Sequence, residues 1–223
     1  KDYLKIFDNV CSRGAFILQN DLEEFEIELS NFLKIKYVVG TNDGTNALIL
    51  GLLANNIGVG DEVILPSHTY IATASAIKFV GAKPVFVDID LNDNLIAPKE
   101  IIKKITKKTK AIMPVHIYGQ PYEISSLKKI AKRNNLLIID DCAEAIGAKY
   151  KGKIVGLEND CSCFSFFANK TITTGEGGMA VFKKKLHADK ARILINQGLS
   201  EKTKYYHEYA GSNFRITNMQ ASI

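Results

Sequence analysis

Long apolar runs are missing from this sequence of 223 residues, and cysteine is scarce. No run approaches the roughly 18 apolar residues that a membrane-spanning helix needs, and nothing in the sequence resembles a signal peptide. Four cysteines are too few for a disulfide scaffold, so free thiols are the simplest interpretation. We therefore expect a cytoplasmic protein with no membrane partner, because reducing compartments keep thiols free.

Three common binding motifs are also missing. Cys161 and Cys163 lack the second ligand pair that a zinc site would show, so we expect no metal. The Lys170-Thr171 pair lacks the glycines of a P-loop, and no G-x-G-x-x-G motif follows the first apolar strand segment. A P-loop nucleotide site and a Rossmann dinucleotide site are therefore disfavoured.

Positive charge is spread along the chain, although the net charge is +5. The densest lysine run, 103–110, has the pattern of the exposed face and end of a helix. We expect this run to be solvated surface, and no nucleic-acid partner. The hydrophobic content of 46% is ordinary for a globular protein and is sufficient for a sizeable core.

Short apolar segments alternate along the chain with helical patterns of similar or greater length. Such continuous apolar strands are typical of a parallel sheet covered on both faces. The sequence therefore predicts an α/β fold with three α/β/α layers and a mostly parallel sheet. The expected strands are 37–40, 61–66, 83–90, 110–119, 136–140 and 178–182, and the expected helices are 47–54, 71–80, 124–133, 186–196 and one that begins at Pro98.

Capping patterns mark both ends of the chain. Asn20 with Glu23 resembles a capping box and predicts a helix start within an N-terminal helix segment, 1–34, that leads into the domain. Thr217 with Gln220 predicts a second such start, and the chain stops within the first turns of that helix. So short a helix has little stability of its own, so we expect the chain to be a piece of a longer protein.

Polar residues follow several of the expected strands. In open α/β sheets, ligands bind beyond the carboxyl ends of the strands. Gly44 and Thr45 lie between a strand and a helix, where free N–H groups and the helix dipole favour an anion such as phosphate; the alternative is an ordinary turn. The polar segments are 43–45, 68–70, 116–120 and 140–144.

Asp140 and Asp141 follow four apolar residues on one of these strands. Adjacent strand residues point to opposite faces, so the two carboxylates need not act together. One of them should lie at a dry end of the sheet, where it requires a cationic or hydrogen-bonding partner. The alternative is a carboxylate that caps the next turn.

Lys170 lies between an aromatic segment and a Thr/Gly-rich turn, with no other charge until Glu176. Burial among Phe164, Phe166 and Phe167 would favour the neutral amine, which can form a Schiff base with an aldehyde. Such a lysine, a carboxylate and a phosphate cup are the parts that a pyridoxal phosphate enzyme needs. The alternative is a surface lysine on a loop.

Seven motifs, in order, resemble those of the DegT-type nucleotide-sugar aminotransferases, which are pyridoxal phosphate enzymes with the aspartate-aminotransferase fold (fold type I). The resemblance extends through nearly the whole chain, and the segment around Lys170 is its most specific part. The motifs are DGTNAL (43–48), PSHTYIATASAI (66–77), PVHIYGQP (114–121), IDDCAEAIGA (139–148), SFFANKTITTGEGGM (165–179), NQG (196–198) and GSNFRITNMQASI (211–223).

The resemblance implies the cofactor pyridoxal 5′-phosphate and a role for each matched residue. Lys170 would form the Schiff base and then move a proton, and as a general base it should be free of salt bridges. Asp141 would bind the pyridine nitrogen. Gly44, Thr45 and Ser165 would hold the phosphate.

Further positions match the family, and at two of them the residue differs from the one that is usual in the family. Tyr70 matches the aromatic residue that stacks on the cofactor ring. Glu144 stands where many members have Gln or His near the phenolic oxygen, and Asp43 replaces the usual serine of the phosphate loop. Asn213 matches an asparagine that reaches the phosphate of the neighbouring subunit, which implies a homodimer with a shared active site.

The resemblance implies two half-transaminations. An amino acid, expected to be L-glutamate, would leave its amine on the cofactor, and a keto sugar linked to a nucleotide would take it. Segments 169–179 and 196–218 are most similar to the perosamine-synthase branch, which aminates C4 of GDP-4-keto-6-deoxymannose. Sugars linked to dTDP or UDP stay open as substrates. Lys170 argues against the related 3-dehydratases, which have His there.

Two other classes of function stay open. Family chains continue into a small C-terminal domain, so residues 1–223 would be the cofactor-binding large domain without it, and such a fragment could be inactive. A nicotinamide oxidoreductase would show a similar alternation of strands and helices. A yellow absorbance band that borohydride bleaches would separate a pyridoxal phosphate enzyme from the oxidoreductase.

Overall fold

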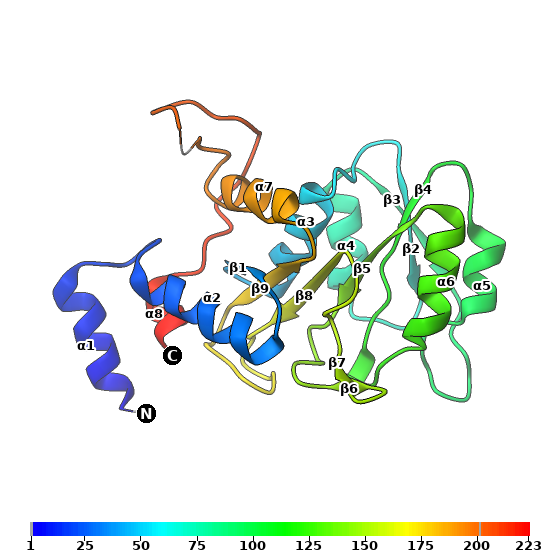
Figure 1. Cartoon of the computed structure of the whole chain (residues 1–223), viewed down its shortest axis with the longest axis horizontal. Helices are drawn as coiled ribbons and strands as arrows, with labels where there is room; N and C mark the ends of the chain where they lie inside the picture. The colour runs from blue at the N-terminus through cyan, green and yellow to red at the C-terminus, as the bar shows by residue number, and fades with distance from the viewer. Residues whose placement is uncertain (1, 201) are drawn as a thin grey trace.

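A seven-stranded sheet forms the centre of the molecule in the computed structural model, which describes residues 2–200 and 202–223 (Figure 1). The strand order is β1-β9-β8-β5-β4-β2-β3. A separate two-stranded ribbon pairs β6 (Lys149–Tyr150) with β7 (Lys153–Ile154). The sheet strands are β1 (Tyr37–Thr41), β2 (Glu62–Pro66), β3 (Lys83–Val87), β4 (Thr109–Ile112), β5 (Leu137–Asp141), β8 (Cys161–Ser165) and β9 (Gly178–Phe182).

Only β9 reverses the common strand direction within this sheet. It pairs antiparallel with both β1 and β8, whereas the β8-β5-β4-β2-β3 neighbours all pair in parallel. The predicted mostly parallel sheet is therefore confirmed. As a result, the carboxyl ends of all the other strands lie along one edge of the sheet, where ligands bind in folds of this type.

Helices cover both faces of the sheet, which confirms the predicted three layers (Figure 1). Alternate strand residues divide between two apolar clusters, as the two-residue period of a strand requires; Ile139 lies in the first and Ile138 in the second. The first cluster includes residues of α3 (Gly44–Ala54), α4 (Ile71–Phe79) and α7 (Lys185–Ile195), and the second includes residues of α2 (Asn20–Leu33), α5 (Pro98–Lys104) and α6 (Ile124–Asn134).

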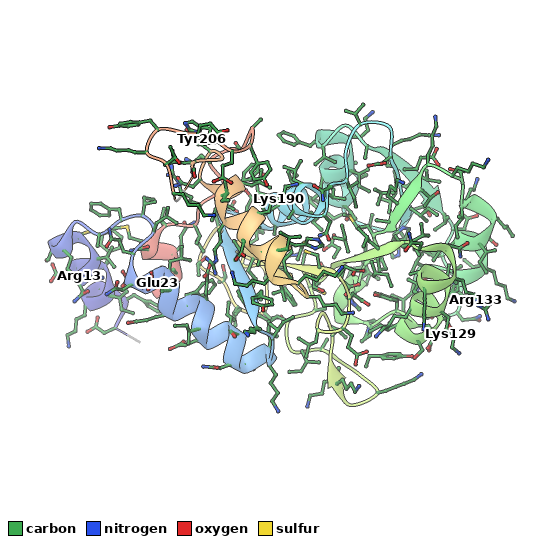
Figure 2. The ribbon with its side chains drawn as sticks, turned by 45° about the horizontal axis from the view of Figure 1, so that its top comes forward. Arg13, Glu23, Lys129, Arg133, Lys190 and Tyr206 are labelled. Atoms are coloured by element: carbon green, nitrogen blue, oxygen red, sulfur yellow. The ribbon has the colours of Figure 1, made fainter. Side chains whose placement is uncertain are left out.

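Most charged side chains lie on the outer surfaces of these layers, whereas Glu26, Glu62, Asp140 and Asp141 are buried. Lys129 and Arg133 of α6 are exposed on the side away from the sheet (Figure 2). The lysines of the 103–110 run are exposed as well, which confirms their interpretation as solvated surface. All four cysteines are free thiols. Among the described residues, no helix has both the length and the apolar character to cross a membrane.

Several elements differ from the sequence-based expectation. Helix α1 (Tyr3–Arg13) lies within the helix segment expected at 1–34, but no bounds of its own were predicted because it is largely exposed. Strand β8 was not predicted, because it mixes cysteine and serine with one phenylalanine. The strand expected at 110–119 ends at Ile112. Pro114 has no N–H for a strand ladder, and a short 3₁₀ turn, η1 (Ile117–Gly119), follows it.

The two ends of the chain pack together through α8 (Asn218–Ser222), which lies beside α1 and α2 (Figure 1). The capping box at Thr217 and Gln220 is confirmed. The one expected at Asn20 is wrong: α2 has no side-chain cap, and the backbone N–H of Gln19 donates to Asn218 Oδ1 instead. The division into a large domain at 1–223 stays a prediction, and its residues 1 and 201 lie outside the described part.

Candidate active site

The polar residues that follow the strands gather at the carboxyl edge of the sheet, as expected. Asp141 ends β5 and Ser165 ends β8, and these two strands pair in parallel. Gly44 follows β1 and opens α3, and its Cα lies against Ser165. The edge therefore brings an acid, a hydroxyl and a helix N-terminus into one region.

Asp141 is a buried carboxylate, only 5% exposed. Its Oδ2 accepts a hydrogen bond from Thr73 Oγ1 (2.8 Å), and its Oδ1 accepts one from the backbone N–H of Ala143 (3.1 Å). Burial raises the pKa of Asp141 above its usual value, although these two bonds and the positive charge of Lys170 act in the opposite direction. Its hydrogen bonds within the described chain come from neutral groups, so the buried carboxylate has the character of a site for a cation.

Lys170 lies close enough to this acid to interact with its charge. Its side chain is 17% exposed, and its Nζ lies 3.6 Å from Glu144 Oε1. The expectation that this lysine is free of salt bridges is therefore wrong. The expected aromatic enclosure is also incomplete, because Phe167 is 44% exposed while Phe164 and Phe166 are buried.

Glu144 is held toward Lys170 by the loop after β4. The backbone N–H of Tyr118 donates to Glu144 Oε2 over 2.6 Å. Tyr118 has a positive φ of 54°, which is uncommon outside glycine, and its ring is 78% exposed. A strained backbone that aims an N–H at a charged group is typical of functional sites.

The N-terminus of α3 has the features of an anion cup. Asp43 caps this helix, because its Oδ1 accepts from the backbone N–H of Asn46 over 2.7 Å. The N–H groups of Gly44 and Thr45 stand in the first turn, where a helix offers no backbone acceptor. A Cβ on Gly44 would lie 2.7 Å from Ser165 Cβ, so only glycine allows this close approach without a shift.

Tyr70 stands at the mouth of this region and is 77% exposed. It is the N-cap residue of α4, one turn before Thr73. Its backbone carbonyl accepts from the backbone N–H of Thr73 (3.2 Å) and lies 3.1 Å from Thr73 Oγ1. The aromatic ring is thus attached to the same turn that contacts Asp141.

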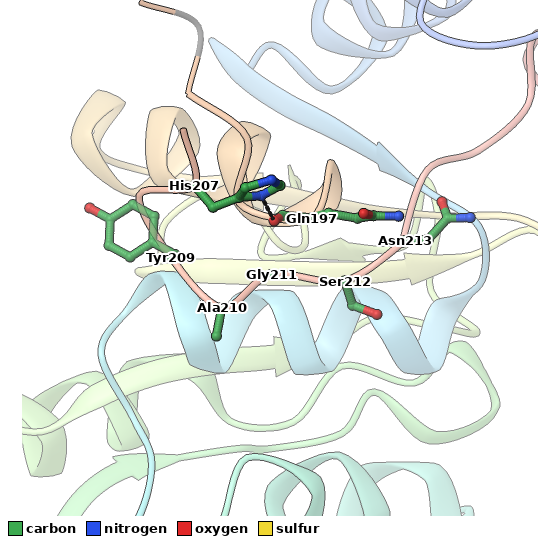
Figure 3. Close-up of a pocket in the computed structure, with 7 residues that line it drawn as sticks. All are labelled: Gln197, His207, Tyr209, Ala210, Gly211, Ser212 and Asn213. Atoms are coloured by element: carbon green, nitrogen blue, oxygen red, sulfur yellow. Dashed lines mark hydrogen bonds between the residues drawn. The ribbon is translucent and has the colours of Figure 1, made fainter. Parts of the chain in front are cut away.

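The side chain of Asn213 contacts none of the other predicted site residues in the hydrogen bonds of the described chain. Its Oδ1 accepts from Arg215 Nε over 2.9 Å, and the side chain is exposed. The carbonyl of the next residue, Phe214, accepts from the backbone N–H of Asn42 (2.8 Å), so this segment runs beside the turn before α3. Asn213 also lines an open depression of about 520 Å³ (Figure 3), which Lys170 does not line.

Thr73 is the residue at this site that sequence reasoning missed. It is fully buried and joins α4 to Asp141 through its hydroxyl. It occurs within the segment 66–77 that carries the family resemblance, so its place in that motif was the available signal. An isolated threonine on an apolar helix gives no other indication of a role.

The comparisons with known proteins agree with this geometry. The model of the DegT/DnrJ/EryC1/StrS aminotransferase family matches residues 1–223. The chain therefore belongs to this family.

Named relatives share much of the sequence. The chain is 46% identical over 221 residues to a GDP-perosamine synthase from Escherichia coli O157:H7, a match that covers 98% of this chain and 61% of the relative. It is 43% identical over 220 residues to a UDP-N-acetyl-3-dehydro-alpha-D-glucosamine 3-aminotransferase from Acidithiobacillus ferrooxidans, with 98% and 58% covered. The chain thus spans about three fifths of the length of these relatives.

Solved structures show the same fold. DesV from S. venezuelae superposes with a TM-score of 0.95 at 38% identity, covering 99% of this chain and 59% of that one. NtdA from Bacillus subtilis, solved with the bound cofactor PMP (pyridoxamine phosphate), gives a TM-score of 0.93 at 33% identity and covers 99% and 50%. The fold is that of the pyridoxal phosphate-dependent aminotransferases.

The residues present fit a cofactor of this kind. A protonated pyridine would supply the cation that the buried Asp141 lacks as a hydrogen-bonding partner. The cup of Gly44, Thr45 and Ser165 suits a phosphate. Lys170 supplies an amine near both the acid and the open edge.

Proposed function

We propose that the protein is a pyridoxal phosphate-dependent aminotransferase that transfers an amino group from L-glutamate to a nucleotide-linked 4-keto-6-deoxy sugar. GDP-4-keto-6-deoxymannose is the proposed acceptor and GDP-perosamine the product. The observation that carries the proposal is the position of the Lys170 amine, whose Nζ lies 3.6 Å from Glu144 Oε1 and whose charge acts on the buried Asp141.

The bound cofactor would supply an aldehyde that condenses with amines and a ring that accepts electrons while its nitrogen stays protonated. Asp141 would keep that nitrogen protonated, since an anion held in a desolvated place stabilises a neighbouring cation strongly. Gly44, Thr45 and Ser165 would anchor the phosphate, and Tyr70 would cover one side of the ring.

Lys170 would be the group that moves protons. Its Nζ lies 3.6 Å from Glu144 Oε1 in this structure, and an ammonium group must lose a proton before its nitrogen becomes a nucleophile. The same Nζ would take the proton from the α-carbon of the amino donor in the first half-reaction, and in the second it would deliver a proton to the sugar carbon that receives the amine.

A second copy of the chain is the proposed partner. Tyr70 is 77% exposed, so the candidate site is open on the side where the ring would lie. Asn213 is exposed too, beside the turn before α3. A homodimer in which Asn213 of one copy reaches the phosphate of the other would close the site, and a cytoplasmic location is proposed with it.

The GDP-linked acceptor is favoured by the 46% identity to a GDP-perosamine synthase. A sugar linked to UDP is the second candidate, because a relative named as a UDP-sugar 3-aminotransferase is 43% identical. The two sequence identities differ little, so the choice between a GDP-linked and a UDP-linked acceptor requires a direct measurement of substrate preference.

A panel of keto sugars linked to GDP, dTDP and UDP tests the proposal. The protein, loaded with pyridoxal phosphate and supplied with L-glutamate, should aminate GDP-4-keto-6-deoxymannose faster than the other sugars. If a dTDP- or UDP-linked sugar were aminated faster, the proposed acceptor would be wrong, but the proposed transamination would stand. A yellow, borohydride-sensitive cofactor without turnover of any sugar would identify an inactive fragment, and no cofactor uptake would overturn the proposal.

A further inference from the structure

Thr73 makes the only hydrogen bond from α4 to Asp141 among the contacts of residues 2–200 and 202–223. Its Oγ1 lies 2.8 Å from Asp141 Oδ2, and both side chains are buried. The other carboxylate oxygen accepts from the backbone N–H of Ala143, which no substitution of a neighbouring side chain can remove. Thr73 is therefore the side chain that fixes the rotation of this carboxylate.

The direction of the hydrogen bonds around Thr73 follows from the acceptors available to it. A hydroxyl has one proton, and Thr73 Oγ1 has both Asp141 Oδ2 at 2.8 Å and the Tyr70 carbonyl at 3.1 Å within reach. The carboxylate is closer and charged, so it takes the proton. Thr69 Oγ1, 2.7 Å from Thr73 Oγ1, then donates to it. The chain of donors thus runs from Thr69 through Thr73 to Asp141.

The charged and titratable groups around Asp141 come from several elements. Lys170 favours its ionised form, whereas Glu144 disfavours it. The thiols of Cys142, directly after β5, and Cys163, on β8, interact with its charge, and burial raises the pKa of each thiol well above its usual value, so both stay neutral. Burial disfavours the ionised form of Asp141, and the hydrogen bond from the Thr73 hydroxyl is a main interaction that favours it.

We propose that Thr73 is a positioning residue that keeps Asp141 ionised and correctly turned for the ring nitrogen of the cofactor. It acts through Asp141 and does not itself contact the reacting atoms. Because the backbone N–H of Thr73 donates to the carbonyl of Tyr70 (3.2 Å), Thr73 also links Asp141 to the turn that carries the aromatic ring. The inference rests on the proposed cofactor site.

The test compares Thr73→Val, which removes the hydroxyl at nearly constant shape, with Thr73→Ser, which keeps it. The first measurement is the titration of the Asp141 carboxyl by carbon-13 NMR in the cofactor-free protein. In the valine variant its midpoint should rise by about one pH unit, since a hydrogen bond to a charged group has that order of effect. The serine variant should titrate like the unsubstituted protein.

The second measurement is the dissociation constant of pyridoxal phosphate at a series of pH values. The valine substitution raises the pKa of Asp141, so the acid side of the affinity profile should move to higher pH. At pH values between the Asp141 titration midpoints of the unsubstituted protein and the valine variant, the variant should bind pyridoxal phosphate up to about tenfold more weakly. Serine should restore the profile. Thermal unfolding of each variant at the same pH values shows which of them are folded.

The two results separate this inference from the proposed function. An Asp141 titration unchanged in Thr73→Val, in a folded protein that binds pyridoxal phosphate, would overturn the role of Thr73 and leave the aminotransferase proposal standing. If the unsubstituted protein takes up no pyridoxal phosphate, the proposed function fails, and the titration still reports whether Thr73 supports the charge of Asp141. A serine variant that behaves like valine would also contradict the inference.

Discussion

Asp140 and Asp141 are neighbours on β5, but their carboxylates lie on opposite faces of the sheet and have different partners. Asp140 is fully buried and accepts from Tyr122 (2.5 Å), Asn159 (2.7 Å) and Ser162 (3.1 Å). Asp141 accepts from Thr73 and one backbone N–H. One acid is surrounded by donors within the fold, and the other lies beside an amine at an open edge.

The first prediction follows from this contrast. Asp140→Asn should lower the free energy of unfolding by about 1–3 kcal/mol, because an amide group would face donors that need an acceptor. Asp141→Asn should raise the free energy of unfolding at neutral pH in the cofactor-free protein, because this substitution removes a desolvated charge. Thermal unfolding of both variants without cofactor measures the difference.

The effect of Asp141→Asn on the free energy of unfolding should depend on pH. The folded pKa of Asp141 is raised above the usual value of 3.8, so its contribution to stability is present below that value and is lost as the pH rises through the folded pKa. The gain from Asp141→Asn should therefore disappear in acid. The variant should still bind pyridoxal phosphate but lose transamination; wild-type turnover in it would contradict the ring-nitrogen role.

The second prediction concerns Lys170. Lys170→Ala should abolish both the yellow band that borohydride bleaches and transamination, because the alanine has no amine. Lys129→Ala is the matched control, since that lysine is exposed on the outer face of α6. Spectra before and after borohydride treatment measure the effect. An alanine variant at position 170 that turned over at an ordinary rate would show that the lysine was assigned wrongly.

Sequence reasoning was most successful where a simple period governs the structure. The two-residue period of strands separated Asp140 from Asp141, and the apolar strand pattern predicted the layers and the edge where the polar residues gather. These features depend on which residues are buried, and burial follows from the local pattern.

Contacts between distant segments were not predictable in the same way. The ion pair between Lys170 and Glu144 depends on how the loops after β8 and β5 meet, and on a positive φ at Tyr118. The start of α2 depends on Asn218, 199 residues away from Gln19 in the chain. No local pattern encodes such partners, because each is fixed only once the sheet has formed.

The third prediction concerns the ion pair of Lys170. Glu144→Gln removes the charge next to the amine but keeps an oxygen for the Tyr118 N–H. Lys170 then has no ion pair to give up before its nitrogen reacts with the cofactor. Cofactor uptake should therefore be faster, by less than about tenfold, since partly exposed pairs contribute about 1 kcal/mol or less.

The measurement is the rate of appearance of the yellow band across pH for Glu144→Gln and the unsubstituted protein. Glu158→Gln serves as control, because Glu158 pairs with Lys128 and Lys153 and not with Lys170. Identical pH profiles for Glu144→Gln and the unsubstituted protein would mean that the ion pair has no influence on cofactor capture.

The last prediction tests the anion cup. Gly44→Ala would place a Cβ 2.7 Å from Ser165 Cβ, so either the start of α3 or the end of β8 must move. Such overpacking should lower the free energy of unfolding by about 1–3 kcal/mol. Because the shift also displaces the N–H groups of the first helical turn, the affinity for pyridoxal phosphate should fall as well, as equilibrium dialysis would measure.

A second substitution separates the steric effect from the loss of the proposed phosphate donor. Combining Gly44→Ala with Ser165→Gly removes the Cβ at 2.7 Å and leaves the Cα of residue 165 at 3.3 Å, so the thermal stability should recover in part. The affinity for pyridoxal phosphate should stay low, because the serine hydroxyl is missing. If the double variant bound the cofactor as tightly as the unsubstituted protein, neither the hydroxyl nor the close approach of Gly44 would contribute to phosphate binding, and the anion would have to be held elsewhere along the sheet edge.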